Sequence, residues 1–434
     1  MALLERRGAY SLEEVPPSVA QGVQRVFGEN LSPVEAVRRI VADVRSRGDA
    51  ALLEYTRRIE GVELQTLEVP RERLEAAYAQ VPDELVDALR LAARRIREFH
   101  QATLPRGWLD FQRGLGELFT PLERVGIYAP GGTASYPSTV LMAAIPARVA
   151  GVREVVVCTP SRDGREPPPA TLVAAHLAEV DRVFQLGGAQ AVAAMAFGTQ
   201  SVPKVDKICG PGNIFVALAK KEVYGHVDID GLYGPTETLL IADDSADPVL
   251  CAADLLAQAE HDVVAWPVLV TVSPALARAV AAELERQLAD LERAETARAA
   301  LERQGFIAVV NTLDEAFQLA NAFAPEHLEL VLREPWSHLG RVRHAGGVFV
   351  GEHSPEVMGD YVAGPSHVMP TGGTARFASY LGVHHFVKPV MVVGLDRETF
   401  ARLAPAASVI GRAEGLTGHA RAAEVRLERM EGKP

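Results

Sequence analysis

The feature that most constrains the fold is a threefold succession of strand, turn and helix patterns in the middle of the chain. Three short apolar runs each precede a turn and then a helical pattern rich in small residues, and two of these turns contain the glycine pairs 131–132 and 187–188. Consecutive units of this kind favour a parallel, doubly wound sheet, and such sheets bind ligands at the carboxyl ends of their strands. The strands and helices are expected, in alternation, at 125–128, 138–149, 154–158, 171–179, 183–186 and 189–197.

A second α/β region follows, because strand and helix patterns alternate again after residue 237. Strands are expected at 238–241, 267–272, 306–310 and 348–350, and helices at 247–259, 274–304 and 313–322. The region before residue 123 instead predicts helices. One begins at the capping box of Ser32 and Glu35 and ends at Gly48, and another covers 83–100.

We therefore expect an α/β protein with two Rossmann-like, doubly wound domains of an incomplete dinucleotide-binding type, a helical N-terminal arm and a helical C-terminal tail. The expected arm covers residues 1–25, and the first α/β domain combines 26–122 with 237–381. The second α/β domain covers 123–236, and the tail covers 382–434.

Composition excludes several classes of protein. The 434 residues are 48% hydrophobic and 23% charged, which is typical of globular proteins, and the net charge of −12 disfavours binding to nucleic acid or to an anionic membrane. Three cysteines without metal-ligand spacing exclude a disulfide scaffold and a zinc finger. The N-terminus lacks the pattern of a signal peptide, and the longest charge-free apolar stretch, 263–277, is too short to span a bilayer. These features predict a cytoplasmic protein.

The turn Gly210-Pro211-Gly212 has two interpretations. The strict dinucleotide fingerprint G-x-G-x-x-G is absent, because Phe215 stands at the third glycine position. A glycine turn followed by Asn213 and an apolar helix would nevertheless present backbone N–H groups to a phosphate. A plain turn explains the same residues, so both interpretations stay open.

A second group of polar residues is compatible with a metal site. Gln258 and His261 are three residues apart near the end of a predicted helix, so their side chains share a face. Asp360 and His367 lie in a loop rich in glycine and proline, and such loops often carry function. A mixed nitrogen and oxygen set suits Zn²⁺ or Mn²⁺, although Q-x-x-H by itself is a weak pattern.

Glu326 and His327 place a carboxyl group beside an imidazole, and the two could serve as proton acceptors of different pKa. The same dipeptide occurs at 260–261 and 352–353, so the pattern alone proves little. Cys209, next to the glycine turn, is a weaker candidate for a nucleophile, because no histidine is near it in the sequence and a free cysteine is often a small buried apolar residue.

Seven segments in this order resemble the histidinol dehydrogenase family, and the resemblance extends from about residue 30 to the C-terminus. They are ERVGIYAPGG (123–132), LGGAQAVAAMAFGT (186–199), KICGPGN (207–213), DLLAQAEHD (254–262), NAFAPEHLEL (321–330), SPEVMGDYVAGPSHVMPTGGTARF (354–377) and EGLTGH (414–419).

The resemblance implies an enzyme of the last steps of L-histidine biosynthesis, which oxidises L-histidinol to L-histidine through L-histidinal with two NAD⁺ and one water. It further implies an intertwined homodimer with one Zn²⁺ per subunit and shared active sites. The C-terminal tail would reach the partner subunit, so that Glu414 and His419 complete the neighbouring site.

Site residues follow from the same resemblance. The implied catalytic proton acceptors are Glu326 and His327. The implied zinc ligands are Gln258, His261, Asp360 and His419. The implied substrate contacts are Thr236, Gln258, His261, His327, Asp360, His367, Glu414 and His419, and the implied NAD contacts are Tyr128, Gln190 and Asn213.

Two residues depart from the family pattern. Thr236 replaces the usual serine before Glu237, which keeps the hydroxyl group and adds a methyl group, and Tyr233 is larger than the residue expected there. Both changes bear on how the pocket fits its substrate.

Three alternatives compete with this interpretation. A related zinc- and NAD-dependent dehydrogenase could act on another polar alcohol, such as a sulfonated diol, although the carboxylate of Glu414 would repel an anionic substrate. A metal-dependent hydrolase could use Glu326 as its base, and a protein without activity could merely bind NAD or a metal. The glycine turns disfavour the hydrolase, and the intact proton acceptors disfavour the inactive protein.

Overall fold

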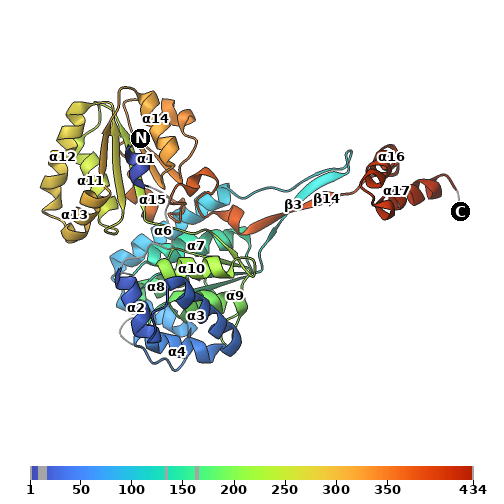
Figure 1. The fold of residues 1–434 in the computed structure, drawn as a ribbon, viewed down its shortest axis with the longest axis horizontal. Coiled ribbons are helices and arrows are strands. Elements are labelled where there is room, and N and C mark those ends of the chain that lie inside the picture. The colour runs from blue at the N-terminus through green and yellow to red at the C-terminus, as the bar shows by residue number, and fades with distance from the viewer. Residues whose placement is uncertain (1, 8–16, 132–134, 162–165, 433–434) are drawn as a thin grey trace. The chain divides into compact units, whose positions relative to one another are not determined.

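The computed structural model describes residues 2–7, 17–131, 135–161 and 166–432. The chain forms two compact units, shown with their helices and strands in Figure 1. One unit comprises Met1–Leu104 and Leu122–Phe386, and the other comprises Pro105–Pro121 and Val387–Pro434. A mixed α/β fold with parallel sheets is confirmed.

The first unit contains a six-stranded sheet in the order β1-β6-β5-β4-β7-β8. All its neighbouring strands are parallel except β1, which pairs antiparallel with β6. Its strands are β1 (Glu68–Val69), β4 (Arg124–Tyr128), β5 (Glu154–Thr159), β6 (Arg182–Gln185), β7 (Lys207–Cys209) and β8 (Asp228–Ile229).

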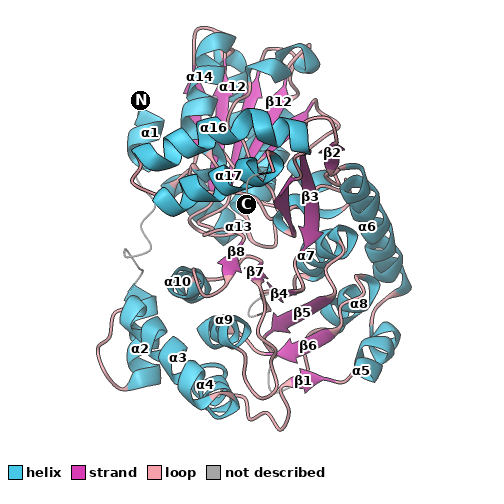
Figure 2. Ribbon diagram, turned by 90° about the vertical axis from the view of Figure 1, so that its right-hand side faces the viewer, coloured by secondary structure: helices cyan, strands magenta, loops and turns pink. Residues whose placement is uncertain are grey.

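Helices cover both faces of this sheet (Figure 2). One layer contains α6 (Asp83–Ala102), α7 (Pro137–Ala150) and α8 (Pro169–Leu177), with α5 (Arg71–Ala76) beside α8. The other layer contains α3 (Pro33–Arg47), α4 (Asp49–Glu60), α9 (Gly188–Phe197) and α10 (Ile214–Val223), and α2 (Pro17–Phe27) contacts α3.

One expected domain boundary is wrong, because the helices between residues 33 and 60 pack with the six-stranded sheet. Residues 26–122 are expected in the domain of 237–381, but Val37, Ile40 and Val44 share a core with Val156 and Phe184 of the six-stranded sheet. The apolar face of α3 packs against the small residues of α9 and α10, which allow the helices to approach closely. The expected capping box of Ser32 and Glu35 is confirmed.

A five-stranded, fully parallel sheet follows, in the order β11-β10-β9-β12-β13. Its strands are β9 (Glu237–Ala242), β10 (Trp266–Thr271), β11 (Phe306–Val309), β12 (His327–Val331) and β13 (Gly347–Val350). The strand β12 was not predicted, because Glu329 interrupts its apolar run. Residues on alternate positions of β9 enter different cores, with Leu240 on one side and Leu239 and Ile241 on the other.

The two cores explain which helices cover which face of this sheet. α11 (Pro248–Ala259), α12 (Pro274–Leu288) and α13 (Ala294–Arg303) pack on the Leu240 side, whereas α1 (Ala2–Arg7) and α14 (Leu313–Phe323) pack on the other. The single helix expected at 274–304 is wrong, because residues 289–293 separate α12 from α13.

The second unit combines a hairpin with a pair of helices. β2 (Trp108–Asp110), β3 (Leu115–Pro121) and β14 (Val387–Val393) form an antiparallel sheet, and α16 (Arg397–Ala413) packs against α17 (Thr417–Met430). The tail expected at 382–434 is therefore not wholly helical. Its first part belongs to the first unit, and its alternating segment 387–393 is a strand that pairs with β3.

Among the described residues, none of the helices combines the length and the apolar character that crossing a membrane requires.

Candidate active site

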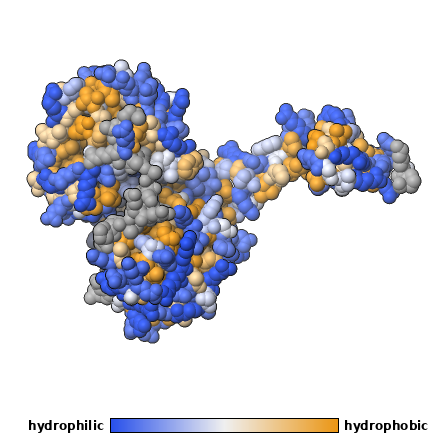
Figure 3. Space-filling model, viewed as in Figure 1, coloured by the Kyte–Doolittle hydropathy of each residue, from blue (hydrophilic) through white to orange (hydrophobic). Residues whose placement is uncertain are grey.

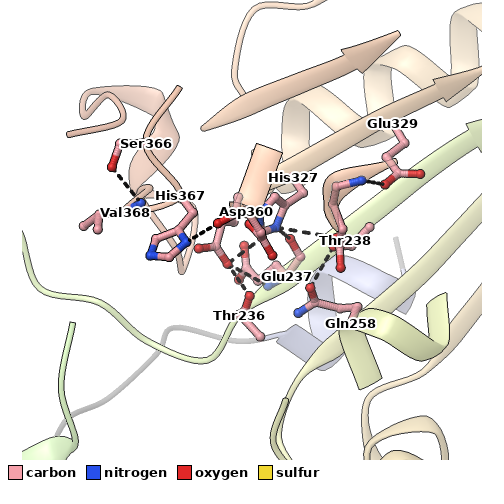
Figure 4. A network of polar contacts seen from close by, with 12 residues as sticks. Thr236, Glu237, Thr238, Gln258, His327, Glu329, Asp360, Ser366, His367 and Val368 are labelled. Carbon is pink, nitrogen blue, oxygen red and sulfur yellow. Dashed lines mark hydrogen bonds and ion pairs between the residues drawn. The ribbon is translucent and has the colours of Figure 1, made fainter. Parts of the chain in front are cut away.

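The polar cluster at the five-stranded sheet lies at the amino ends of the strands. β9 begins at Glu237 and β12 at His327, and the strands are paired so that His327 lies opposite Thr238 (Figure 4). α11 runs back along the sheet and brings Gln258 to the same edge. The sheet type instead predicts a site at the carboxyl ends of the strands. Here the polar residues lie at the starts of β9 and β12 and at the C-terminal end of α11.

His327 is buried, and acceptor oxygens lie near both of its ring nitrogens. Its Nδ1 lies 3.2 Å from the carbonyl oxygen of Glu237, and its Nε2 lies 3.5 Å from Oδ1 of Asp360. Because a carbonyl oxygen only accepts, Nδ1 must donate, and in the neutral ring the lone pair is then on Nε2. Burial alone would lower the pKa of His327, but the charges of Glu326, Glu356 and Asp360 raise it well above its usual value.

Glu326 is a buried carboxyl group held in one orientation. Its Oε2 accepts hydrogen bonds from the hydroxyl group of Thr236 at 2.6 Å and from the backbone N–H of Glu237 at 3.0 Å. Burial raises its pKa, although His327 and these two donors counteract the effect. The structure thus assigns the hydroxyl group of Thr236 a specific partner, which the sequence did not reveal.

Asp360 connects the other site residues. It lies on α15 (Glu356–Tyr361), and its carbonyl oxygen accepts from Nδ1 of His367 at 2.8 Å. The opposite ring nitrogen of His367 lies 3.3 Å from Oγ1 of Thr139, on α7. Burial alone would raise the pKa of Asp360, but its interaction with His327 and the nearby charges of His367 and His261 lower it.

A buried chain of hydrogen bonds, which the sequence did not reveal, lies behind these residues. The hydroxyl group of Thr238 lies 2.8 Å from Oε1 of Gln258 and also makes a short contact with Oε2 of Glu356. The backbone N–H of Glu356 donates to Oε1 of Glu329 at 2.8 Å, and the Glu329 carboxyl group is hydrogen-bonded to that of Asp254. Burial raises the pKa of Glu356 to about 8. Asp254 and Gln258 are four residues apart on α11, so their side chains share a face. This spacing is the signal in the sequence that could have placed Asp254 near the site.

The residues expected to hold zinc are divided between the two units. Gln258, His261 and Asp360 belong to the first unit. Burial lowers the pKa of His261, and the charge of Asp360 partly offsets this effect. Glu414 and His419 belong to the second unit and are exposed there. In the part of the chain that the structure describes, no three His, Cys, Asp or Glu side chains form a metal-binding group by themselves.

The residues in the first unit nevertheless suit a metal. An imidazole and a carboxylate of lowered pKa are suitable zinc donors, and an amide can add an oxygen. Gln258 also has a buried side-chain nitrogen with no hydrogen-bond partner among the described residues. An unpaired polar atom of this kind is uncommon in a protein interior, and it is compatible with a site that is completed by a ligand.

The expected NAD contacts lie around the glycine turns of the six-stranded sheet. The hydroxyl group of Tyr128 accepts from the backbone N–H of Gly188 at 3.1 Å. A pocket of about 300 Å³ opens beside Gly188, Gln190 and Asn213, with apolar residues of α2 on the opposite wall. Oε1 of Gln190 is buried and has no partner among the described residues, so it could accept a hydrogen bond from a ligand hydroxyl group.

Asn213 favours the plain interpretation of the glycine turn. Its side-chain oxygen caps α10 by accepting from the backbone N–H groups of Phe215 and Val216, which are then unavailable to a phosphate. The turn itself is held by Asp230, which accepts from the N–H of Gly210 at 2.6 Å. Cys209 is buried, which raises the pKa of its thiol well above the usual value and disfavours a role as nucleophile.

Glu60 was also missed, and it leads to a prediction about stability. Its Oε1 lies 3.3 Å from Nε2 of Gln190, its Oε2 has no partner among the described residues, and burial raises its pKa from 4.5 to about 7. Between these values the folded state binds more protons than the unfolded state, so stability falls as the pH rises. Glu60→Gln removes this charge and offers an N–H to Gln190. It should therefore stabilise the protein by about 2 kcal/mol at pH 8 and by much less near pH 5.

Urea unfolding of the two proteins at both pH values measures this difference, and Glu63→Gln is the matched control, since Glu63 is exposed on the same segment. An equal gain at both pH values would show that the charge of Glu60 is not responsible.

Comparison with known proteins shows the relationship of the chain. Residues 26–427 match the model of the histidinol dehydrogenase family. Histidinol dehydrogenase of Deinococcus radiodurans is 53% identical over 423 residues, which are 96% of each chain, and that of Moorella thermoacetica is 53% identical over 398 residues, 90% of this chain and 94% of its own. The crystal structure of histidinol dehydrogenase from Elizabethkingia anophelis has a TM-score of 0.90 and 34% identity, covering 96% of this chain and 98% of its own. The chain is therefore an oxidoreductase that belongs to the histidinol dehydrogenase family.

Proposed function

We propose that this enzyme oxidises L-histidinol to L-histidine through L-histidinal, with two NAD⁺ and one water. The observation that carries the proposal is the buried pair of Glu326 and His327 facing Asp360, in a chain of this family. Oxidising an alcohol to an acid requires two hydride transfers, each with loss of a proton. A site for it therefore needs proton acceptors that are already in place.

His327 takes the proton of the alcohol in the first oxidation. The hydrogen bond from its Nδ1 to the carbonyl oxygen of Glu237 holds the ring so that Nε2 faces the site. Nε2 can accept this proton only when the ring enters the reaction neutral, and the neighbouring carboxylates then stabilise the imidazolium that forms. Asp360, 3.5 Å from Nε2, both orients the ring and balances its charge.

Glu326 activates the water that hydrates the aldehyde before the second oxidation. Its Oε2 is held by Thr236 and by the N–H of Glu237, so the carboxyl group keeps one orientation. The pKa raised by burial makes Glu326 a stronger base than an exposed carboxylate. Threonine at position 236 keeps the hydrogen bond that a serine would make, and its role is to position Glu326 in addition to contacting substrate.

Gln258, His261, Asp360 and the partner subunit's His419 would hold one Zn²⁺, and Tyr128, Gln190 and Asn213 would contact NAD⁺. Bound zinc would fix the imidazole and amino nitrogens of the substrate, and bound NAD⁺ would accept the hydride. Thr236, His367 and the partner subunit's Glu414 would complete the contacts to the substrate.

We further propose a homodimer in which the second unit of each chain completes the site of the other. The second unit exposes apolar side chains on α16 and on the turn after it, including Val409 (68% exposed), Ile410 (58%) and Leu416 (45%). Apolar surface on this helix pair is visible in Figure 3. An exposed apolar surface next to Glu414 and His419 supports a protein–protein contact at this point.

Activity measurements with histidinol test the proposal. Purified enzyme with Zn²⁺ should form two NADH per histidinol consumed, and removal of the metal with a chelator should abolish turnover until Zn²⁺ is restored. The absence of turnover in the zinc-loaded enzyme would refute the proposed reaction. A sulfonated diol should not be a substrate, since the carboxylate of Asp360, whose pKa is lowered, would repel its sulfonate group.

A further inference from the structure

The hydroxyl group of Thr238 lies against two oxygen atoms, each of which can accept a hydrogen bond from it. It is 2.8 Å from Oε1 of Gln258 and in short contact with Oε2 of Glu356, and all three residues are buried. A hydroxyl group has only one hydrogen, so it can donate to only one of these oxygens. At the same time Nε2 of Gln258, which carries two hydrogens, has no acceptor among the described residues.

Turning the amide of Gln258 by half a rotation satisfies these groups together. Nε2 then donates to the hydroxyl oxygen of Thr238, and the hydroxyl group donates to Glu356, which has an accepting oxygen whether or not it is protonated. Oε1 of Gln258 then lies at the position of the unpaired nitrogen. The hydrogen bonds could also run in the opposite direction. A proton on Glu356 is then donated to Thr238 and the hydroxyl group donates to Oε1 of Gln258, which leaves the buried nitrogen unpaired.

The difference matters because only the oxygen of an amide is a good metal ligand. With the amide turned, Oε1 of Gln258 points away from Thr238. With the hydrogen bonds in the opposite direction, Oε1 accepts the hydrogen bond of Thr238. Glu356 is held through its backbone N–H by Glu329, which is hydrogen-bonded to Asp254 on the same helix as Gln258.

We propose that Thr238 and Glu356 are positioning residues that fix the amide of Gln258 with its oxygen free for the metal. The inference rests on the zinc site of the proposed function and adds two residues that do not touch the metal themselves. Residues behind a metal ligand typically change metal affinity by about 10–100-fold when they are replaced.

The test is the zinc affinity of Thr238→Val, which keeps the shape of the side chain and removes the hydroxyl group. Zinc binding to the full-length dimer is measured by competition with a coloured chelator. Thr238→Val should weaken it by about 10–100-fold, and Thr238→Ser should restore it. Thr271→Val is the matched control, because Thr271 is equally buried in β10 of the same sheet, and its zinc affinity should equal that of the wild type.

Zinc binding by Thr238→Val that equals or exceeds that of the wild type would overturn the inference, because loss of the hydroxyl group would then release Oε1. A wild-type enzyme that binds no zinc would instead overturn the zinc site of the proposed function, and the inference with it. Should Thr238→Val not fold, neutron diffraction from the zinc-loaded wild type decides. Two deuterium atoms on the amide atom nearest Thr238 support the inference, and an oxygen at that position refutes it.

Discussion

Glu326→Gln should leave the oxidation of histidinol to histidinal largely intact and slow the oxidation of histidinal by about 10²–10⁴-fold. Glutamine keeps an oxygen that can accept from Thr236 and from the N–H of Glu237, so the local structure should persist. It cannot take a proton from water, and the aldehyde must be hydrated before the second hydride leaves. The loss should therefore fall on the second step.

Rapid-mixing measurements with histidinol and, separately, with histidinal resolve the two steps. The control is Glu352→Gln, which makes the same charge change at an exposed residue whose carboxylate accepts from the N–H of Asp247. It should leave the ratio of the two rates unchanged. Equal slowing of both steps by Glu326→Gln would contradict the assigned role.

His419→Ala should strip zinc from the enzyme and abolish turnover in the homodimer. His419 is exposed in the second unit, so its loss should leave the folding of the first unit unchanged. The zinc content of the purified variant and its thermal unfolding measure these two effects separately. A variant that retains zinc and activity would refute the role of His419 as a ligand.

Mixed dimers test whether the site is shared. In a dimer of His419→Ala and Glu326→Gln chains, the site that takes Glu326 from the first chain and His419 from the second is intact. Neither variant alone should form histidine at an appreciable rate. Random mixing of the two should therefore restore about a quarter of the wild-type rate of histidine formation. Mixing His419→Ala with the double variant His419→Ala, Glu326→Gln should restore none. No recovery in the first mixture would refute the shared site.

Local patterns predicted the elements that depend on local physical chemistry. The helix that begins at Ser32 is confirmed because a capping box and a regular apolar face act within a few turns. The strands β4, β5, β9 and β10 were predicted because parallel strands buried on both faces are continuous apolar runs. The strand β12 was missed, since Glu329 is satisfied inside the protein by partners that are distant in the sequence.

The sequence by itself determined the α/β class, the family and the types of residue available for the chemistry, because these depend on composition, spacing and motifs. Only the tertiary structure decided which of these residues act on one another. It joined Thr236 to Glu326 and Thr238 to Gln258 and Glu356, and it packed α3 against the six-stranded sheet. The physical reason is that hydrogen bonds and charges act over a few ångströms in space. Residues 20 to 118 positions apart therefore become partners only when the chain has folded.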